Sequence, residues 1–143
     1  MFDQYFQGWE VRPEFQPEFI SLWEGWLGPG HIHELDQVAE PQWQRFNALL
    51  KLVVERYDVL RADPERSQVT LISNPDEITQ SFDASMAKDA SQFVRLVIPA
   101  LGCVLAEDWD FTYILWYKDQ AAVDALAPLV ESAGLHHFRR SAA

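Results

Sequence analysis

The sequence predicts an α+β fold in which a small mixed sheet of about three strands packs with about five helices. Three observations carry this prediction. Apolar residues recur at three- and four-residue steps across 41–61, which is typical of a helix with one buried stripe. Residues 68–73 form a short β-branched run that indicates a strand. Residues 111–117 are apolar on both faces, which suits a central strand covered by helices on both sides, or by a helix on one side and a partner on the other.

The first predicted helix spans residues 17–27, where the large apolar side chains follow helical spacing. Pro17 suits the first turn of a helix, and the Gly-Pro-Gly sequence at 28–30 would end it. The long helix 41–61 follows, and a polar turn leads from it into the strand 68–73.

Two more helices are predicted at 75–82 and 85–98. The first has a start signature, because Asn74 can cap it and Glu77 can reach back as in a capping box. The second shows helical spacing of its apolar residues, and Pro99 favours a stop just after it.

The last part of the chain predicts a hairpin and a final helix. The hairpin joins strands 103–108 and 111–117 through an acidic link. The helix covers 120–133, with Asp119 as its N-terminal cap and Gly134 just past its end. The first two predicted strands are joined by helical connections, and the strand order is not readable from the sequence.

Length and composition predict a single globular domain over residues 1–143, with residues 1–16 an aromatic, acidic N-terminal arm. Eight of the first 26 residues are aromatic, five are acidic and one is basic. The formal net charge is −11. Such a field attracts basic protein surfaces and repels phosphate backbones, so we expect no nucleic-acid partner.

Cys103 is the only cysteine, so no intrachain disulfide can form, and its apolar neighbours predict a buried, inert thiol. The sequence shows neither a signal peptide nor an apolar stretch long enough to span a membrane. We therefore expect a cytoplasmic protein without a membrane partner.

No catalytic or cofactor motif stands out in the sequence, so we expect no cofactor, and a non-enzymatic role is favoured over an enzyme. Two histidine pairs are weak candidates for metal ligands, since imidazoles from both ends of the chain would have to meet in space. The expectation is that there is no metal site. The histidines concerned are His31, His33, His136 and His137.

The leading hypothesis is a protein-interaction module or inhibitor, in a role like that of an immunity protein, which binds a basic protein partner. An aromatic anchor would fill a pocket of the partner while carboxylates steer association. The candidate interaction residues are Trp9, Trp23, Glu24, Trp26, Asp108, Trp109 and Asp110.

Two alternatives remain open at this point. One is a small ligand-binding domain or enzyme, whose aromatic pocket is edged by acidic groups and lined by Trp109, Tyr113, Trp116 and Tyr117. The other is a homodimer, because an apolar strand or a tryptophan-rich helix can close a symmetric interface.

Overall fold

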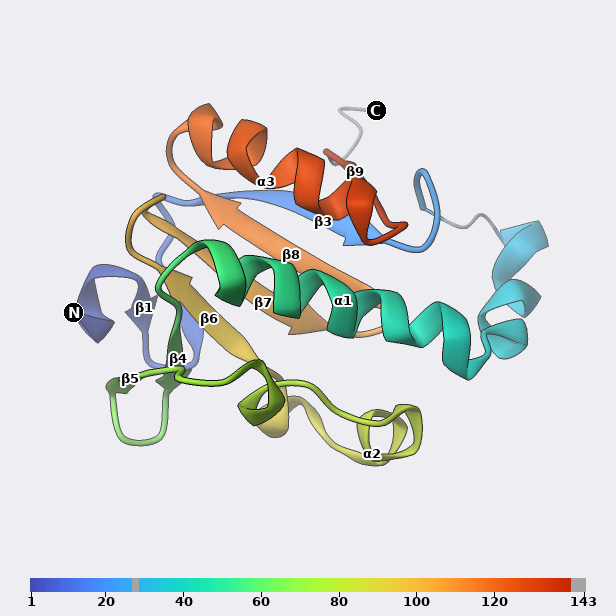
Figure 1. Cartoon of the computed structure of the whole chain (residues 1–143), viewed down its shortest axis with the longest axis horizontal. Coiled ribbons are helices and arrows are strands. Elements are labelled where there is room, and N and C mark those ends of the chain that lie inside the picture. Colours follow the sequence, from blue (N-terminus) through green and yellow to red (C-terminus); the bar gives the residue numbers. More distant parts are fainter. Residues whose placement is uncertain (27–28, 140–143) are drawn as a thin grey trace.

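The structure is a computed structural model that describes residues 1–26 and 29–139. Its centre is a seven-stranded antiparallel sheet with the strand order β5-β4-β6-β7-β8-β3-β9 (Figure 1). The strands are β3 (Gln16–Ser21), β4 (Leu60–Asp63), β5 (Gln68–Leu71), β6 (Arg95–Ile98), β7 (Cys103–Asp108), β8 (Thr112–Tyr117) and β9 (His136–Phe138).

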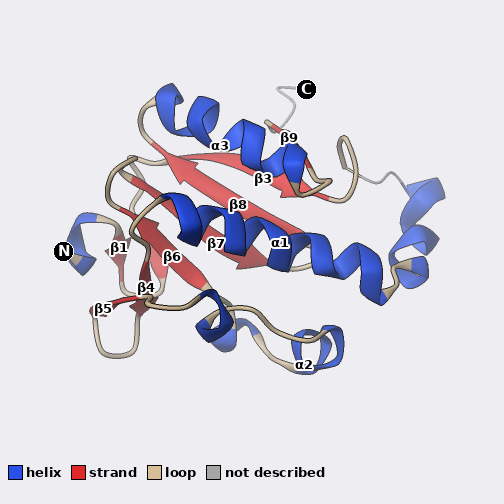
Figure 2. Cartoon of the chain, in the orientation of Figure 1, coloured by secondary structure: helices blue, strands red, loops and turns tan. Residues whose placement is uncertain are grey.

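Two long helices cover one face of this sheet, α1 (Glu40–Arg56) and α3 (Gln120–Ser132) (Figure 2). The N-terminus of α1 has a side-chain cap in which Gln42 accepts a hydrogen bond from the backbone N–H of Ala39. The main core lies between these helices and the sheet. Its fully buried side chains include Phe46, Leu50, Leu96, Leu105 and Leu126.

The N-terminal arm covers part of the opposite face. It forms a 3₁₀ turn, η1 (Phe2–Gln4), and a two-stranded hairpin of β1 (Phe6–Gln7) and β2 (Glu10–Val11). Gly8 opens the two-residue turn at φ 61°, a conformation that glycine adopts freely. All aromatic residues of this arm except Trp9 are buried, and they build a second, smaller core together with sheet residues. The buried members of this core are Phe2, Tyr5, Phe6, Phe15, Ala62, Val97 and Val104.

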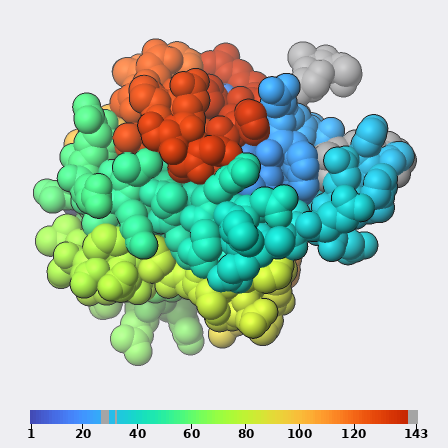
Figure 3. Space-filling model, turned by 45° about the vertical axis from the view of Figure 1, so that its right-hand side comes forward, coloured from blue at the N-terminus to red at the C-terminus, as the bar shows by residue number. Residues whose placement is uncertain are grey.

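A strap of short elements runs beside α1 between β5 and β6 (Figure 3). It contains η3 (Pro75–Glu77), α2 (Phe82–Ala87) and η4 (Ala90–Gln92). The strap is fixed to α1 through the side chain of Asn47, which donates to the backbone carbonyl of Gln80 at 2.6 Å and accepts from its N–H at 3.2 Å. The remaining short helix, η2 (Pro29–Gln37), lies at one end of the molecule in Figure 1.

The predicted arrangement of a three-stranded mixed sheet and five helices is therefore wrong. The sheet has seven strands, all pairs are antiparallel, and only three segments are α-helices within the residues described. In place of the first half of the helix predicted at 17–27 the structure has β3, and the end of that prediction, residue 27, lies outside the described residues. The helix predicted at 85–98 is replaced by α2, η4 and β6. The helix at 41–61 ends at Arg56, and that at 75–82 is a single turn of η3 before α2.

None of the helices that the structure describes is both long enough and apolar enough to cross a membrane.

Candidate functional site

The most unusual backbone of the molecule lies in the turn between β7 and β8. Asp110 and Phe111 follow each other with φ of 59° and 56°, in the left-handed region that residues with a side chain seldom adopt. Asp tolerates this conformation, whereas a bulky residue such as Phe does so at a cost in free energy. The turn is therefore held by packing around it.

That packing comes from aromatic rings on three other segments. Phe111 stacks on Phe82 of α2 with ring centroids 6.3 Å apart, and it meets Trp23 and Trp43 edge-on. Trp109, in contrast, is 56% exposed. Its ring stands edge-on to that of Phe93, with the two ring centroids 4.7 Å apart. The partly buried ring of Phe111 thus anchors the turn, while the side chain of Trp109 is largely exposed to solvent.

Two neighbouring hollows meet at this turn, and we call them together the tryptophan cleft. Both are lined by the residues at the tip of the hairpin, Asp108, Trp109, Asp110 and Thr112. The outer hollow, of about 280 Å³, adds Ser21, Trp23, Gly25, Trp26 and Leu35. The inner hollow, of about 130 Å³, adds Trp43, Ser85, Met86, Phe93, Glu107, Phe111 and Tyr113.

The outer hollow combines exposed indole rings with carboxylates. Trp26 is 55% exposed, and its ring stands edge-on to Phe19 and Phe138 at 4.6 and 5.1 Å, so it is held in place on the sheet. Asp108 and Asp110 supply negative charge, and no lysine or arginine is found among the described residues that line this hollow. The surface is therefore suited to a positively charged group.

The inner hollow ends at a buried ion pair. Lys88 binds Glu107, and the two side chains are only 8% and 4% exposed. Gln80 accepts a hydrogen bond from Lys88 at 2.7 Å, and the backbone N–H of Val94 donates to Glu107 at 3.0 Å. Burial lowers the pKa of Lys88 below its ordinary value, although the hydrogen bond and charge of Glu107 oppose this effect.

Tyr113 also lines the inner hollow, opposite Glu107 in the pairing of β7 with β8. It is 2% exposed, its ring stacks on Phe46, and its hydroxyl has no hydrogen-bond partner among the described residues. Burial raises the pKa of Tyr113 well above its ordinary value, and the negative charge of Glu107 raises it further. The hydroxyl is thus neutral and enclosed by the protein.

Five of the seven predicted interaction residues come together in this cleft, although they come from two distant parts of the sequence: Trp23, Trp26, Asp108, Trp109 and Asp110. The other two do not. Trp9 lies on the N-terminal hairpin over the guanidinium of Arg95, at 5.2 Å from its ring centroid, and the exposed Glu24 lines neither hollow.

The predicted aromatic pocket is present only in part. Trp109 and Tyr113 line the inner hollow, as that alternative requires. Tyr117 is buried in the main core instead, and Trp116 packs against the second core on the opposite face of the sheet.

The two histidine pairs lie on separate elements, and one histidine of each pair contacts a carboxylate. His31 of η2 is 3.3 Å from a carboxylate oxygen of Glu34, and Nδ1 of His137 in β9 is 2.7 Å from Glu18. Across residues 1–26 and 29–139, no group of three or more potential ligands is placed to hold a metal ion. Cys103 is buried in the main core, where burial raises its pKa to about 12.

The walls of the inner hollow that come from other elements were not predicted from the sequence. Trp43 was assigned to the buried stripe of the long helix, and Phe93 to the stripe of a helix that the structure does not contain. Lys88 could have been singled out from the sequence, because it is the one basic residue between Arg66 and Arg95. Its partner Glu107 lies near the end of the predicted strand 103–108, beside the acidic link, and the structure places it at an inward position of β7.

No protein-family model, curated protein or solved structure matches this chain.

Proposed function

We propose that this protein is an interaction module that binds a basic protein partner through the tryptophan cleft. The observation that carries the proposal is the outer hollow, where the exposed rings of Trp26 and Trp109 stand beside the carboxylates of Asp108 and Asp110. An ammonium or guanidinium group between these rings would gain both cation–π attraction and charge pairing.

The size of the hollow supports a side chain as the occupant. About 280 Å³ is enough for the end of one lysine or arginine, while the rest of the partner would rest on the rim. Tryptophan is enriched among the residues that dominate binding energy, and acidic groups at a rim mainly speed association. The net charge of −11 adds long-range attraction to a basic surface. An inhibitor of a basic enzyme or toxin is one form that such a module would take.

The first test compares tryptophan variants. The protein is immobilised, partners are captured from native extract at low salt, and the affinity of the purified partner is then measured against each variant. We expect Trp26→Ala and Trp109→Ala to weaken binding by at least tenfold, because they remove the rings of the cleft. The matched control is Trp9→Ala, a tryptophan outside the cleft that is 47% exposed, against 55% for Trp26 and 56% for Trp109. Equal losses for all three variants would contradict the proposal.

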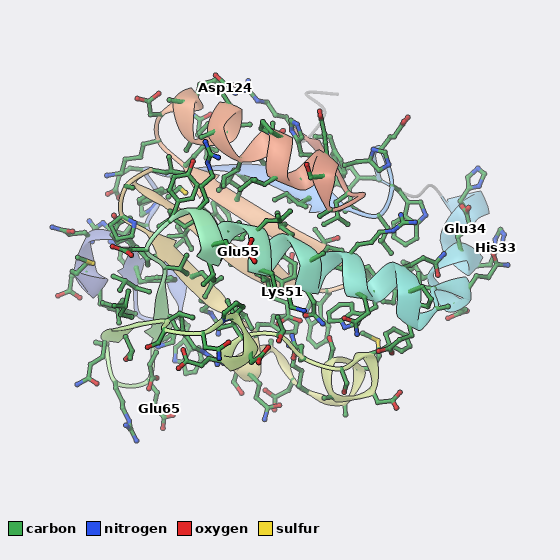
Figure 4. All side chains as sticks on the ribbon, viewed as in Figure 1. His33, Glu34, Lys51, Glu55, Glu65 and Asp124 are labelled. Carbon is green, nitrogen blue, oxygen red and sulfur yellow. The ribbon has the colours of Figure 1, made fainter. Side chains whose placement is uncertain are left out.

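The second test concerns charge. Asp108→Asn and Asp110→Asn should lower the association rate and reduce its dependence on salt. Asp124→Asn is the control, because Asp124 lies on α3 at the end of the molecule away from the β7–β8 turn (Figure 4). Binding that is insensitive to salt and to both cleft aspartates would overturn the proposed role.

A further inference from the structure

We propose that the edge strand β5 pairs with β5 of a second copy of this chain, antiparallel and around a two-fold axis at Thr70. The proposal does not depend on the tryptophan cleft, because no residue of β5 lines either hollow. It starts from the strand order, in which β5 has β4 on one side and no strand of the described residues on the other (Figure 1).

The free edge of β5 presents the backbone groups of two residues. The N–H of Ile72 donates to the carbonyl of Val59 at 2.8 Å, which fixes the alternation of the ladder between β4 and β5. In an antiparallel pair, every second residue turns both its N–H and its C=O to the neighbouring strand. Thr70 therefore bonds to β4, whereas Val69 and Leu71 turn their N–H and C=O groups away from the sheet.

The strand β5 lacks the features that ordinarily keep a sheet edge from pairing, namely charged side chains, proline and bulges. Its sequence is Gln-Val-Thr-Leu, and its pairing with β4 is continuous. Leu71 is 55% exposed beside the partly buried Val69. The opposite edge strand, β9, differs because it carries His136 and His137 and leads into Arg139.

A second copy fits this edge because the pairing is self-complementary. Val69 and Leu71 lie on either side of Thr70, so a two-fold axis at Thr70 places Leu71 of each chain opposite Val69 of the other. Both residues then exchange backbone hydrogen bonds across the axis. Val69 packs against the second core, and Leu71 lies on the same face, so the pairing extends that core from one chain to the other. The two Thr70 side chains meet at the axis, which is a favourable cross-strand pair.

The charges at the two ends of β5 also suit this antiparallel arrangement. Arg66 precedes the strand with its side chain 75% exposed, and it contacts Asp63 only loosely, at 3.8 Å. Glu77 lies at the other end, where its carboxylate accepts a hydrogen bond from the N–H of Ser73 at 3.0 Å. Pairing around Thr70 brings Arg66 of each chain toward Glu77 of the other. These contacts are exposed to solvent, so they favour the register and add little affinity.

The dimer should be weak and should become stronger with salt. Asp63, Glu65 and Asp76 lie near the ends of the strand, and each chain carries a net charge of −11, so the two copies repel each other at long range. The contact is also small, since β5 has four residues. Salt screens the repulsion and leaves the backbone hydrogen bonds and apolar contacts in place. Binding of a basic protein at the tryptophan cleft has the opposite dependence on salt.

Sedimentation equilibrium tests the association, with protein concentrations from about 10 µM to about 1 mM. We expect a monomer at the lowest concentration and mainly dimer at the highest. Thr70 is exposed, so Thr70→Lys should fold; it places two ammonium groups against each other at the axis and should weaken dimerisation at least tenfold. Thr70→Asp should do the same. An equimolar mixture of the two variants should associate again, because lysine then faces aspartate.

The matched control is His136→Lys, at an exposed position of the other edge strand, and it should leave the dimer unchanged. Amide hydrogen exchange of the wild type tests the register without any variant. The N–H groups of Val69 and Leu71 should exchange at least threefold more slowly at about 1 mM than at about 10 µM. The N–H of Thr70, which bonds to β4, should exchange slowly at both concentrations.

Three results would overturn the inference: a monomer at every concentration, a dimer that Thr70→Lys leaves intact, or Thr70 variants that fail to associate when mixed. If Val69 and Leu71 became protected only when a basic partner protein is added, the edge would take a strand of that protein, and the assignment to a second copy would be wrong. Trp26→Ala and Trp109→Ala, which test the proposed function, should not change dimerisation, so the two proposals fail separately.

Discussion

Lys88 and Glu107 form a buried ion pair that fastens the strap to the sheet. Lys88 follows α2 on the strap, and Glu107 lies on β7, where it also accepts a hydrogen bond from the backbone of Val94. The pair lies at the inner end of the tryptophan cleft. Its integrity therefore decides whether the strap keeps Ser85 and Met86 in place as walls of the inner hollow.

Removing either partner of this pair should destabilise the protein strongly. Lys88→Met leaves the Glu107 carboxylate buried without its cation, and Glu107→Gln leaves the ammonium in the same position, so each should cost about 3 kcal/mol in the free energy of unfolding. Urea denaturation measures this cost. The control is Lys51→Met on the exposed side of α1 (Figure 4), which should change stability by less than about 0.5 kcal/mol. Similar small values for Lys88→Met would show that the pair is not structural.

The sequence predicted helix caps well at two places. Asp119 does cap α3, accepting a hydrogen bond from the N–H of Ala121 at 2.9 Å, and Gly134 follows that helix at φ 80°. Asn74 also caps a helical turn as its sequence signature predicts. These signals act through backbone atoms only a few residues away, so the sequence contains them in full.

The predictions failed where a strand is covered on both faces. In β6, Leu96 belongs to the main core and Val97 to the second core on the opposite face. In β3, Phe19 and Ile20 are both buried. Alternation of polar and apolar residues disappears in such strands, and the remaining apolar spacing fits a helix equally well. The N-terminal hairpin covers part of the second face of the sheet. This contact joins distant parts of the chain, so local sequence patterns do not reveal it.

In the candidate site, too, the local features were predicted from the sequence and the long-range contacts were not. Trp109 and the acidic residues beside it were predicted because they share one short link in the sequence. The contacts of that link with Trp23, Trp43 and Phe93 depend on how the sheet is assembled, and they join residues that are far apart in the chain. The positive φ of Phe111 could not be read from its residue type, because tertiary packing imposes it.

The N-terminal hairpin should contribute to stability through its buried face alone. Phe6 is buried in the second core and stacks on Phe2 at 5.0 Å, so Phe6→Ala should lower the free energy of unfolding by about 3 kcal/mol. Trp9 is 47% exposed at the turn of the same hairpin, and Trp9→Ala should cost less than about 1 kcal/mol. Thermal and urea unfolding of both variants tests this. A small effect of Phe6→Ala would mean that the arm detaches from the sheet in solution.

Cys103 should make the protein less stable in alkali. Its pKa is raised from 9.0 to about 12 by burial, so the unfolded chain loses the thiol proton first. Between these two values the unfolded state binds fewer protons, and stability falls as the pH rises, by about 1 kcal/mol near pH 10 for this group. Cys103→Ala should flatten that slope when its unfolding is compared with wild type at several pH values. An unchanged slope, or fast alkylation of the native thiol, would contradict this assignment.

In the turn between β7 and β8, one substitution should raise the stability of the protein and lower its affinity for the partner. Aspartate tolerates φ 59° better than most residues, but glycine adopts it more freely still, so Asp110→Gly should raise the free energy of unfolding by up to about 1 kcal/mol. The same variant deletes a carboxylate of the tryptophan cleft, so the affinity for the basic partner should fall. The matched control is Ser67→Gly, at φ 54° in the turn between β4 and β5, which should stabilise equally and leave binding unchanged.

Asp110→Asn separates the two effects at that position. Asparagine tolerates the left-handed conformation as aspartate does, so stability should stay within about 0.5 kcal/mol of wild type while affinity falls as in Asp110→Gly. Chemical denaturation and partner titration of the three variants give both quantities. If Asp110→Asn bound the partner as wild type does, the carboxylate would have no part in recognition, and the strain of this turn would need another explanation.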